Sequence, residues 1–205
     1  MSKMKTTTYP VEWKKIVNLE DSLLGKFSRE PEIKLGINLL MICLGSRFGL
    51  RISDLISLRW KDLLGKEVNE EFIITEKKTN KNRTMMMTDN VRKTFVMVYE
   101  HFSPNPNHFI FCSQKSDGSR PMSVWNFNHR LKQIFAAQDV KTMGNVSSHM
   151  LRKSFVVSSI KKGMENGDPL SLVKVSRLIN HSSVKTTLYY TNFEVSTLTN
   201  LYNLD

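Results

Sequence analysis

Residues 48–63 read FGLRISDLISLRWKDL, a glycine elbow followed by apolar residues at helical spacing. That spacing predicts a helix over Ser53–Leu63. The strongly apolar segment Ile33–Leu44, which comes just before, is long enough for a buried helix. Gly49 lies between the two predicted helices. We therefore expect the chain to turn at this glycine and to project Arg51 from the elbow.

The next segment has the pattern of a β-hairpin with a basic tip. Phe72–Ile74 is typical of a strand, residues 77–83 are polar and basic, and Thr84–Met87 is again mostly apolar. Asn80 suits a tight turn because asparagine tolerates turn conformations better than most residues. The sequence therefore predicts two short antiparallel strands.

The rest of the chain is predicted to be mainly helical. Helices are expected over 89–101, 123–137, 147–162 and 170–179, from Ser182 to Tyr190, and over 195–202, with a short strand at 109–111. The expected fold class is mainly α with a small antiparallel β-sheet (α+β). Residues 1–30 are expected to be a polar lead-in with one short helix, and residues 31–205 to form one domain that ends in a tail at 191–205.

Composition narrows the class of protein. The 205 residues include 30 Lys and Arg against 19 Asp and Glu, a net charge of +11, which favours a polyanionic partner such as nucleic acid. The apolar run Leu39–Leu44 is far too short to span a bilayer, and the N-terminus has no apolar signal region. Cys43 and Cys112 lack metal-ligand spacing and are interpreted as reduced thiols of a cytoplasmic protein.

Several basic residues and a tyrosine could build one phosphate site. His149 and Arg152 are three residues apart, so they share one face of a helix. Arginine grips phosphate oxygens through two parallel hydrogen bonds, and Arg51 could complete such a clamp. His181 could donate to the same phosphate, and Tyr190 could attack it in a cationic pocket. A lysine of the hairpin tip could protonate the leaving oxygen.

Taken singly, each of these residues has an ordinary explanation, such as a surface arginine, a core histidine or a packing tyrosine. Their joint occurrence at matching spacing favours a common site. Three segments, residues 48–63, 149–155 and 178–190, resemble the signature boxes of the tyrosine recombinases, or phage-integrase family, in the same order. The resemblance covers about residues 30 to 200 and implies a tyrosine recombinase catalytic domain at 31–205 with a C-terminal tail helix at 191–205.

The resemblance implies a role for each matching residue. Arg51, Arg152 and His181 would hold the scissile phosphate. Tyr190 would attack it, forming a 3′-phosphotyrosyl bond and releasing a 5′-hydroxyl. It also implies that Arg152→Ala abolishes cleavage, and we expect this substitution to cost little folding stability.

Other residues would assist. Lys78 would be the general acid for the leaving oxygen, His149 would assist proton movement at the tyrosine, and Asp54 would support the site without taking part in the chemistry. The residues expected to contact DNA are Lys77, Lys81, Arg83 and Lys153. The implied reaction needs no metal, no ATP and no other cofactor, and the implied partners are double-stranded DNA and three further copies in a tetramer on DNA. The implied source is a bacterial mobile element or phage, with a cytoplasmic, nucleoid-associated protein.

Several alternatives stay open. Tyr189 competes with Tyr190, although the family interval favours Tyr190; Lys77 and Lys81 compete with Lys78. Asn180 stands where the family commonly has glycine.

The family commonly carries an N-terminal DNA-clamping domain, and here only a short lead-in precedes the boxes. The chain is therefore either an excised catalytic domain or similar to short members such as fimbrial-switch invertases. The tail could dock on a neighbouring protomer or on its own domain. Rival functions are a type IB topoisomerase-like nicking-closing enzyme and a DNA-binding regulator without catalysis.

Overall fold

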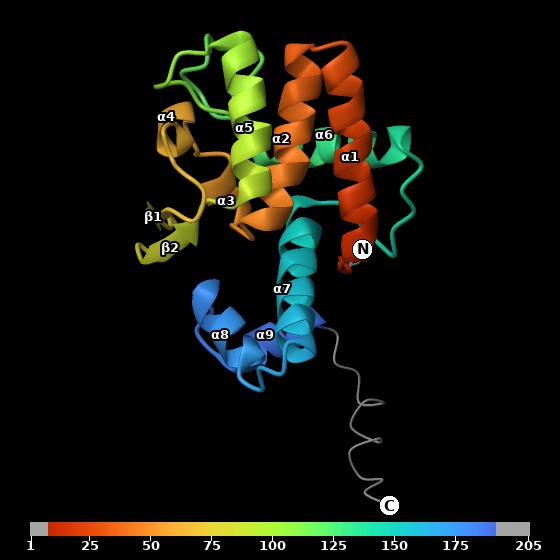
Figure 1. The fold of residues 1–205 in the computed structure, drawn as a ribbon, viewed down its shortest axis with the longest axis vertical. Coiled ribbons are helices and arrows are strands. Elements are labelled where there is room, and N and C mark those ends of the chain that lie inside the picture. Colours follow the sequence, from red (N-terminus) through yellow and green to blue (C-terminus); the bar gives the residue numbers. More distant parts are fainter. Residues whose placement is uncertain (1–7, 192–205) are drawn as a thin grey trace, which may run out of the picture.

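The structure is a computed structural model that describes residues 8–191. Over this range the chain is mainly helical, with one two-stranded antiparallel sheet (Figure 1). In chain order the elements are α1 (Trp13–Arg29), α2 (Ile33–Arg47), α3 (Ile52–Leu55), α4 (Trp60–Leu63), β1 (Glu71–Thr75), β2 (Asn82–Met86), α5 (Asp89–Phe102), α6 (Val124–Ala137), α7 (Ser148–Glu165), α8 (Ser171–Leu178) and α9 (Val184–Thr191). The predicted fold class is confirmed.

Helix α2 is the centre of the main core. It is apolar on nearly all sides, and all residues from Leu39 to Ser46 are buried, as expected for a helix covered by neighbours on every face. Helices α1, α5, α6 and α7 pack against it. In Figure 1, α1 and α5 lie on either side of α2. No described helix combines the length and the apolar character that crossing a membrane requires.

Helix α1 is longer than the short helix expected in the lead-in. It has 17 residues, and Ile16, Leu19, Leu23 and Phe27 are buried along one face. These apolar residues form a narrow stripe among many polar ones, so the mean polarity of the segment concealed the helical period. A division between a lead-in at 1–30 and a domain at 31–205 remains a prediction, but α1 shares the main core.

The single helix expected over 53–63 is wrong. The structure has two short helices, α3 and α4, separated by a turn and an extended link. The backbone of residues 58–60 hydrogen-bonds to the backbone of residues 108–110, and those groups are then not free to continue a helix. The strand expected at 109–111 is likewise reduced to isolated bridges.

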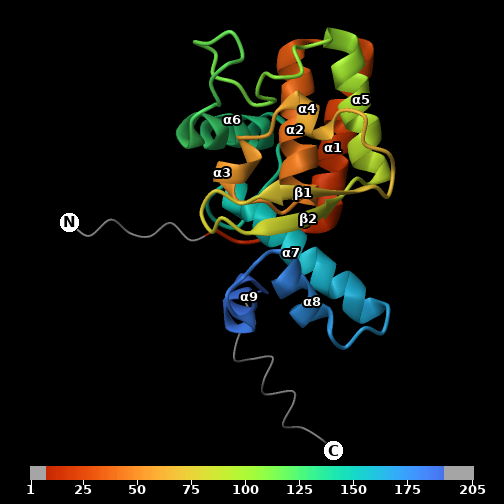
Figure 2. The same ribbon diagram turned by 90° about the vertical axis from the view of Figure 1, so that its left-hand side faces the viewer.

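The hairpin prediction is confirmed. Strands β1 and β2 pair antiparallel, with Ile73 opposite Thr84. Asn80 has a φ of +52° in the connecting loop, and its N–H donates to Glu76 O at 2.8 Å. The hairpin lies beside α8 (Figure 2), where Asn180 Nδ2 donates to Asn82 O at 3.3 Å.

Helices α7, α8 and α9 form a second, smaller group. The N-terminal half of α7 belongs to the main core, whereas its C-terminal half packs with α8 and α9 around Val156, Ile160, Val175 and Ile179. Helix α7 therefore joins the two groups (Figure 1).

Serine hydroxyls cap two of the helices. Ser123 caps α6 and accepts from Asn126 N. The capping hydroxyl of α9 belongs to Ser183, which accepts from Thr186 N at 3.3 Å, and not to Ser182. The helix expected at 195–202 and the tail lie outside the described residues.

Candidate active site

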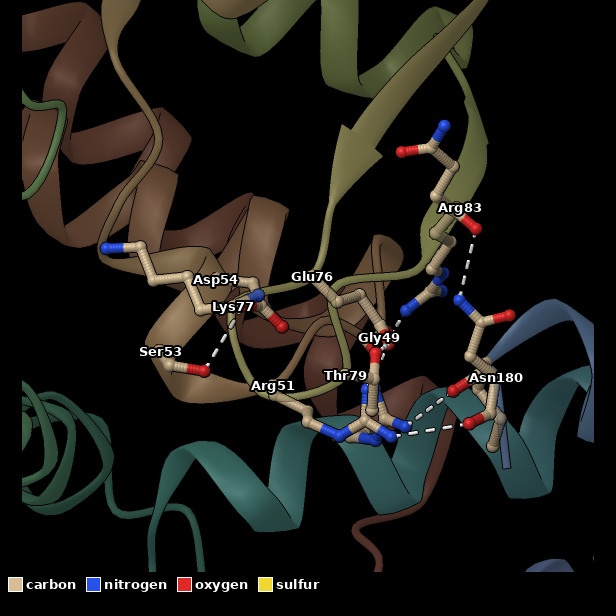
Figure 3. Close-up of polar contacts among 12 residues, drawn as sticks. Gly49, Arg51, Ser53, Asp54, Glu76, Lys77, Thr79, Arg83 and Asn180 are labelled. Atoms are coloured by element: carbon tan, nitrogen blue, oxygen red, sulfur yellow. Dashed lines mark hydrogen bonds and ion pairs between the residues drawn. The ribbon is translucent and has the colours of Figure 1, made fainter. Parts of the chain in front are cut away.

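The Gly49 elbow is the point where two buried guanidinium groups meet. Its carbonyl oxygen accepts from Arg83 Nη1 at 3.0 Å and from Arg152 Nη1 at 2.6 Å. Its φ is +55°, and a Cβ at this position would lie 2.3 Å from Phe155 Cδ1. Only glycine combines this conformation with so close a neighbour. The elbow therefore brings β2 and α7 to the same carbonyl (Figure 3).

Arg152 is held from both sides. It lies on α7, is 2% exposed, and its Nη2 donates to Ile179 O at 2.9 Å. Burial lowers the pKa of its guanidinium, while the phenol of Tyr190 acts in the opposite direction. Since arginine stays protonated at neutral pH, Arg152 is a rigid cation next to the tyrosine.

Arg51 faces the same place from the start of α3. Its Nη1 lies 2.5 Å from Glu76 Oε2, and its Nη2 donates to Asn180 O at 3.4 Å. Arg51 and Arg152 thus contact two successive carbonyls just after α8, which is the negative end of that helix. These contacts hold the segment that leads to His181.

Two carboxylates lie among the arginines. Asp54 and Glu76 are both fully buried. Asp54 Oδ1 accepts from Lys77 N at 2.9 Å, so this side chain ties α3 to the base of the hairpin loop. The cluster contains three guanidiniums, those of Arg51, Arg83 and Arg152, and two carboxylates. Its formal charge is therefore three minus two, or one net positive charge. A phosphodiester monoanion would neutralise it.

The structure separates the two candidate tyrosines. The ring of Tyr190 lies 4.7 Å from the ring of His181 and 5.0 Å from that of His149, edge to face in both cases. Lys153 Nζ lies 5.8 Å from the centre of the same ring. Tyr189 is 69% exposed. Tyr190 is the tyrosine that the fold places among the predicted site residues.

Both histidines are held in their neutral form. The pKa of His181 falls from 6.5 to about 4, because its ring is desolvated and because Arg152 and Arg51 are nearby cations. The side chain of His149 is still partly open to solvent, and its partial desolvation, followed by the charges of Lys153 and Arg152, lowers its pKa. His181 Nδ1 lies 2.9 Å from the hydroxyl of Thr187. A ring that accepts this hydroxyl on Nδ1 carries its proton on Nε2 and can donate it to an oxygen.

The hairpin lysines are exposed. Lys77 extends away from the arginine cluster (Figure 3). Within the described part of the chain, Lys78 makes no hydrogen bond or ion pair through its side chain, and Lys81 is likewise solvent-exposed. Lys153 is half-buried, and its Nζ donates to Thr8 O at 2.7 Å.

Arg83 is buried, and its side chain contacts the protein backbone in this structure. It is 2% exposed, and both its terminal nitrogens donate to the backbone of residues 48 and 49. The strand alternation explains this, since Arg83 and Met85 occupy the inward positions of β2. In this structure Arg83 supports the Gly49 elbow, and a contact of this arginine with DNA stays a prediction.

Sequence reasoning missed Glu76. This residue comes directly after β1 and precedes the basic tip, and a lone acidic residue among lysines was the available signal. It also missed Thr187, which lies one turn before Tyr190 and contacts His181.

Asn180 stands where the family commonly has glycine, and its backbone conformation shows how the chain accommodates this difference. Its φ is +51°, in the left-handed region that asparagine tolerates better than most residues other than glycine. Asparagine therefore keeps the turn that glycine would make, and its side chain adds a hydrogen bond to Asn82 O.

Comparisons with known proteins agree on one family. Residues 25–196 match the phage integrase family. The chain is 25% identical to the probable integrase/recombinase YoeC of Bacillus subtilis, over 93% of this chain and 92% of YoeC. It is 27% identical to the tyrosine recombinase XerD of Rickettsia bellii, over 73% of this chain and 50% of XerD. The chain thus spans about half of that second relative.

Solved structures share the fold. The XerH site-specific recombinase, in a post-cleavage complex with a palindromic difH substrate, superposes with a TM-score of 0.67 at 19% identity, over 96% of this chain and 53% of XerH. The Tn1549 transposon integrase, in complex with transposon right end DNA, gives a TM-score of 0.67 at 17% identity, over 100% of this chain and 68% of that one.

Proposed function

This chain belongs to the phage integrase family, and from that membership we propose that it is a site-specific DNA recombinase that cuts and rejoins DNA through Tyr190. The relatives it matches are named integrases and tyrosine recombinases. The solved neighbours XerH and the Tn1549 integrase are complexes with DNA. The net charge of +11 suits the same polyanionic partner.

The phosphate is held by cations that are already in place. Arg51 and Arg152 are fixed by backbone carbonyls and by Glu76, so little reorganisation is needed when the phosphate arrives. In this proposal Thr187 donates to Nδ1 of neutral His181, so the Nε2–H of the ring donates a further hydrogen bond to the phosphate. Donors that are oriented in advance stabilise the charge that grows on the phosphoryl oxygens.

Tyr190 is the nucleophile in this proposal. Its phenol oxygen attacks phosphorus, and neutral His149 beside the ring helps to take up the phenol proton. Arg152 lies next to the phenol. The product is a 3′-phosphotyrosyl bond.

Lys78 completes the reaction by protonating the leaving oxygen. The bond from phosphorus to the 5′-oxygen breaks, and this oxygen takes the proton of the lysine and leaves as a 5′-hydroxyl. One phosphoester is exchanged for another, so the reaction needs neither ATP nor metal. Strand exchange requires paired sites, and we propose that four copies of the chain assemble on DNA.

One observation carries the proposal: the ring of Tyr190 contacts the rings of both His149 and His181, with Arg152 beside it. We expect Tyr190→Phe to abolish the covalent protein–DNA adduct and Tyr189→Phe to leave it unchanged. The probe is a pool of randomised duplexes, each with one nick, in which the cleaved end diffuses away and the adduct is trapped. Adducts are recovered after denaturation in detergent. Loss of the adduct in Tyr189→Phe instead would contradict the assignment.

The trapped duplexes also separate the rival functions. A recombinase joins two copies of the recovered sequence into recombinant products. A type IB topoisomerase-like enzyme relaxes a single supercoiled circle without pairing sites. A regulator binds DNA, with strong salt dependence, and forms no adduct at all.

A further inference from the structure

The inference concerns Glu76, a buried carboxylate that the mechanism above uses only as a neighbour of Arg51. We propose that Glu76 is a positioning residue that ties Arg51 of the phosphate clamp to the loop that carries Lys78. Through this tie, the residue sets where the leaving-group lysine is presented. The inference rests on the proposed function.

Glu76 makes one contact on each side. Its Oε2 lies 2.5 Å from Arg51 Nη1 and accepts from the hydroxyl of Thr79 at 2.9 Å. Arg51 belongs to the clamp, whereas Thr79 follows Lys78 in the loop. One carboxylate oxygen therefore joins the arginine to the residue next to the lysine (Figure 3).

The backbone of Glu76 closes the same loop. Its N–H donates to Lys81 O at 3.0 Å, and its carbonyl accepts from Asn80 N at 2.8 Å. Asp54 Oδ1 holds Lys77 N at 2.9 Å. These hydrogen bonds to the loop backbone are all made by Glu76 or by Asp54 of α3, the helix that follows Arg51.

Lys78 has no comparable support. Its side chain is exposed and has no hydrogen-bond or ion-pair partner among residues 8–191. Its ammonium group is consequently positioned by the loop backbone alone. A substitution that frees the loop should therefore slow proton transfer from Lys78 more than it weakens phosphate binding.

The burial of Glu76 makes the loss of either partner costly. Its side chain is 0% exposed, and its Oε1 has no hydrogen-bond partner. A buried charge is expensive unless it is paired. The arrangement is therefore stable only while Arg51 and the loop both stay in place.

A sulfur substrate isolates the effect on the lysine. When the bridging 5′-oxygen of the scissile phosphate is replaced by sulfur, the leaving group is a thiolate. Thiols have a pKa near 8.5, so the thiolate leaves without a proton from Lys78. Defects in leaving-group protonation disappear with this substrate, and defects in phosphate binding remain.

The variants are Glu76→Gln and Thr79→Val, with Thr75→Val as the matched control. Thr75 is an exposed threonine of the same hairpin whose hydroxyl donates to Asn82 Oδ1 at 3.0 Å, away from the arginines. Single-turnover adduct formation is measured on oxygen and sulfur versions of a trapped duplex, and the Kd for the same duplex is measured separately.

We expect Glu76→Gln to slow cleavage of the oxygen substrate by about tenfold or more, a part of the range that general acids supply. Thr79→Val should slow it by about threefold, and Thr75→Val should match the unmodified chain. All three should cut the sulfur substrate within about threefold of the unmodified chain, with Kd changed by less than that.

Three results would overturn the inference: equal slowing on both substrates, a Kd that rises by the same factor as the rate falls, or a Thr79→Val variant that matches Thr75→Val. If Glu76→Gln fails to fold, as judged by circular dichroism, Thr79→Val decides the question. If the unmodified chain forms no adduct, the proposed function fails and the inference with it. If every variant cleaves the oxygen substrate at the normal rate, the inference about Glu76 is wrong while the proposed function stands.

Discussion

At the scale of single residues, the site depends on backbone carbonyls as much as on side chains. The oxygens of Gly49, Ile179 and Asn180 together receive hydrogen bonds from Arg51, Arg83 and Arg152. Because a carbonyl position follows from φ and ψ, the conformation of the backbone at these residues sets the direction of the cations.

Gly49→Ala should be strongly destabilising, by about 3 kcal/mol. The left-handed conformation costs a residue with a Cβ about 1–2 kcal/mol, and overpacking against Phe155 adds about 1–3 kcal/mol. Gly65→Ala is the matched control, because Gly65 also has a positive φ but no atom within 4 Å of the added Cβ. Urea unfolding should show a loss of only about 1 kcal/mol for Gly65→Ala. Equal losses in the two variants would contradict the proposed role of Phe155.

The folding stability should decrease as the pH is lowered, because of His181. Its pKa in the folded state is about 4, below the unfolded value of 6.5. Between these values the unfolded chain binds a proton that the folded chain does not, so stability is present above pH 6.5 and is lost as pH falls towards 4. His181→Asn should reduce this loss in urea titrations at pH 7, 5.5 and 4.5. A variant with the same pH dependence as the unmodified chain would show that His181 does not titrate in this way.

At the scale of elements, arginines link segments that lie far apart in the sequence. Arg152 joins α7 to the Gly49 elbow and to the end of α8, and Arg51 adds a second contact to that end. The hairpin is joined to α3 through Asp54 and to the α8–α9 turn through Asn180. The side chains of the proposed site therefore also connect these elements.

Arg152→Ala should destabilise the fold as well as abolish cleavage, which corrects the expectation that it would cost little stability. The substitution leaves Ile179 O without this donor, whereas Gly49 O keeps its hydrogen bond from Arg83 Nη1. One unsatisfied buried carbonyl costs about 1–3 kcal/mol, and we expect a loss of this size in urea unfolding. Lys161→Ala on the exposed face of the same helix is the control, because its ion pair with Glu165 lies at the surface and such pairs contribute about 0–1 kcal/mol. Losses of similar size would refute the structural role.

At the scale of the whole molecule, two cores of unequal size meet at the site. The main core extends from α1 to the first half of α7, whereas the second consists of four buried apolar residues with a few partly buried neighbours. The arginines lie on the main body and at the junction, and Tyr190 lies with the smaller core. The distance between Tyr190, the proposed nucleophile, and the arginines of the proposed phosphate clamp thus depends on how the two parts are joined.

The smaller core should open more readily than the main one. Local unfolding free energies follow the number of buried apolar contacts. In native-state hydrogen exchange, the amides of α8 should exchange through an opening of lower free energy than those of α2. Equal protection of α2 and α8 would show that the two cores unfold as a single cooperative unit.

Much of the arrangement could be predicted from the order of residues. The length of the apolar run Ile33–Leu44, the hairpin with Asn80 at its turn, and the shared face of His149 and Arg152 are local properties. Apolar spacing reports which side of an element is buried, and the turn propensity of a residue acts over a few positions.

The rest depended on partners far along the chain. Arg83 looked like a surface cation and proved to be buried, because the carbonyls that receive it belong to the Gly49 elbow. Residues 53–63 kept a helical period, but pairing with residues 108–110 divided the helix. A buried charge or an interrupted helix is stable only where another segment supplies its hydrogen bonds, and local sequence does not say which segment that is. The choice of Tyr190 over Tyr189 follows the same rule, since neighbours in the folded chain place one phenol among cations and leave the other exposed to water.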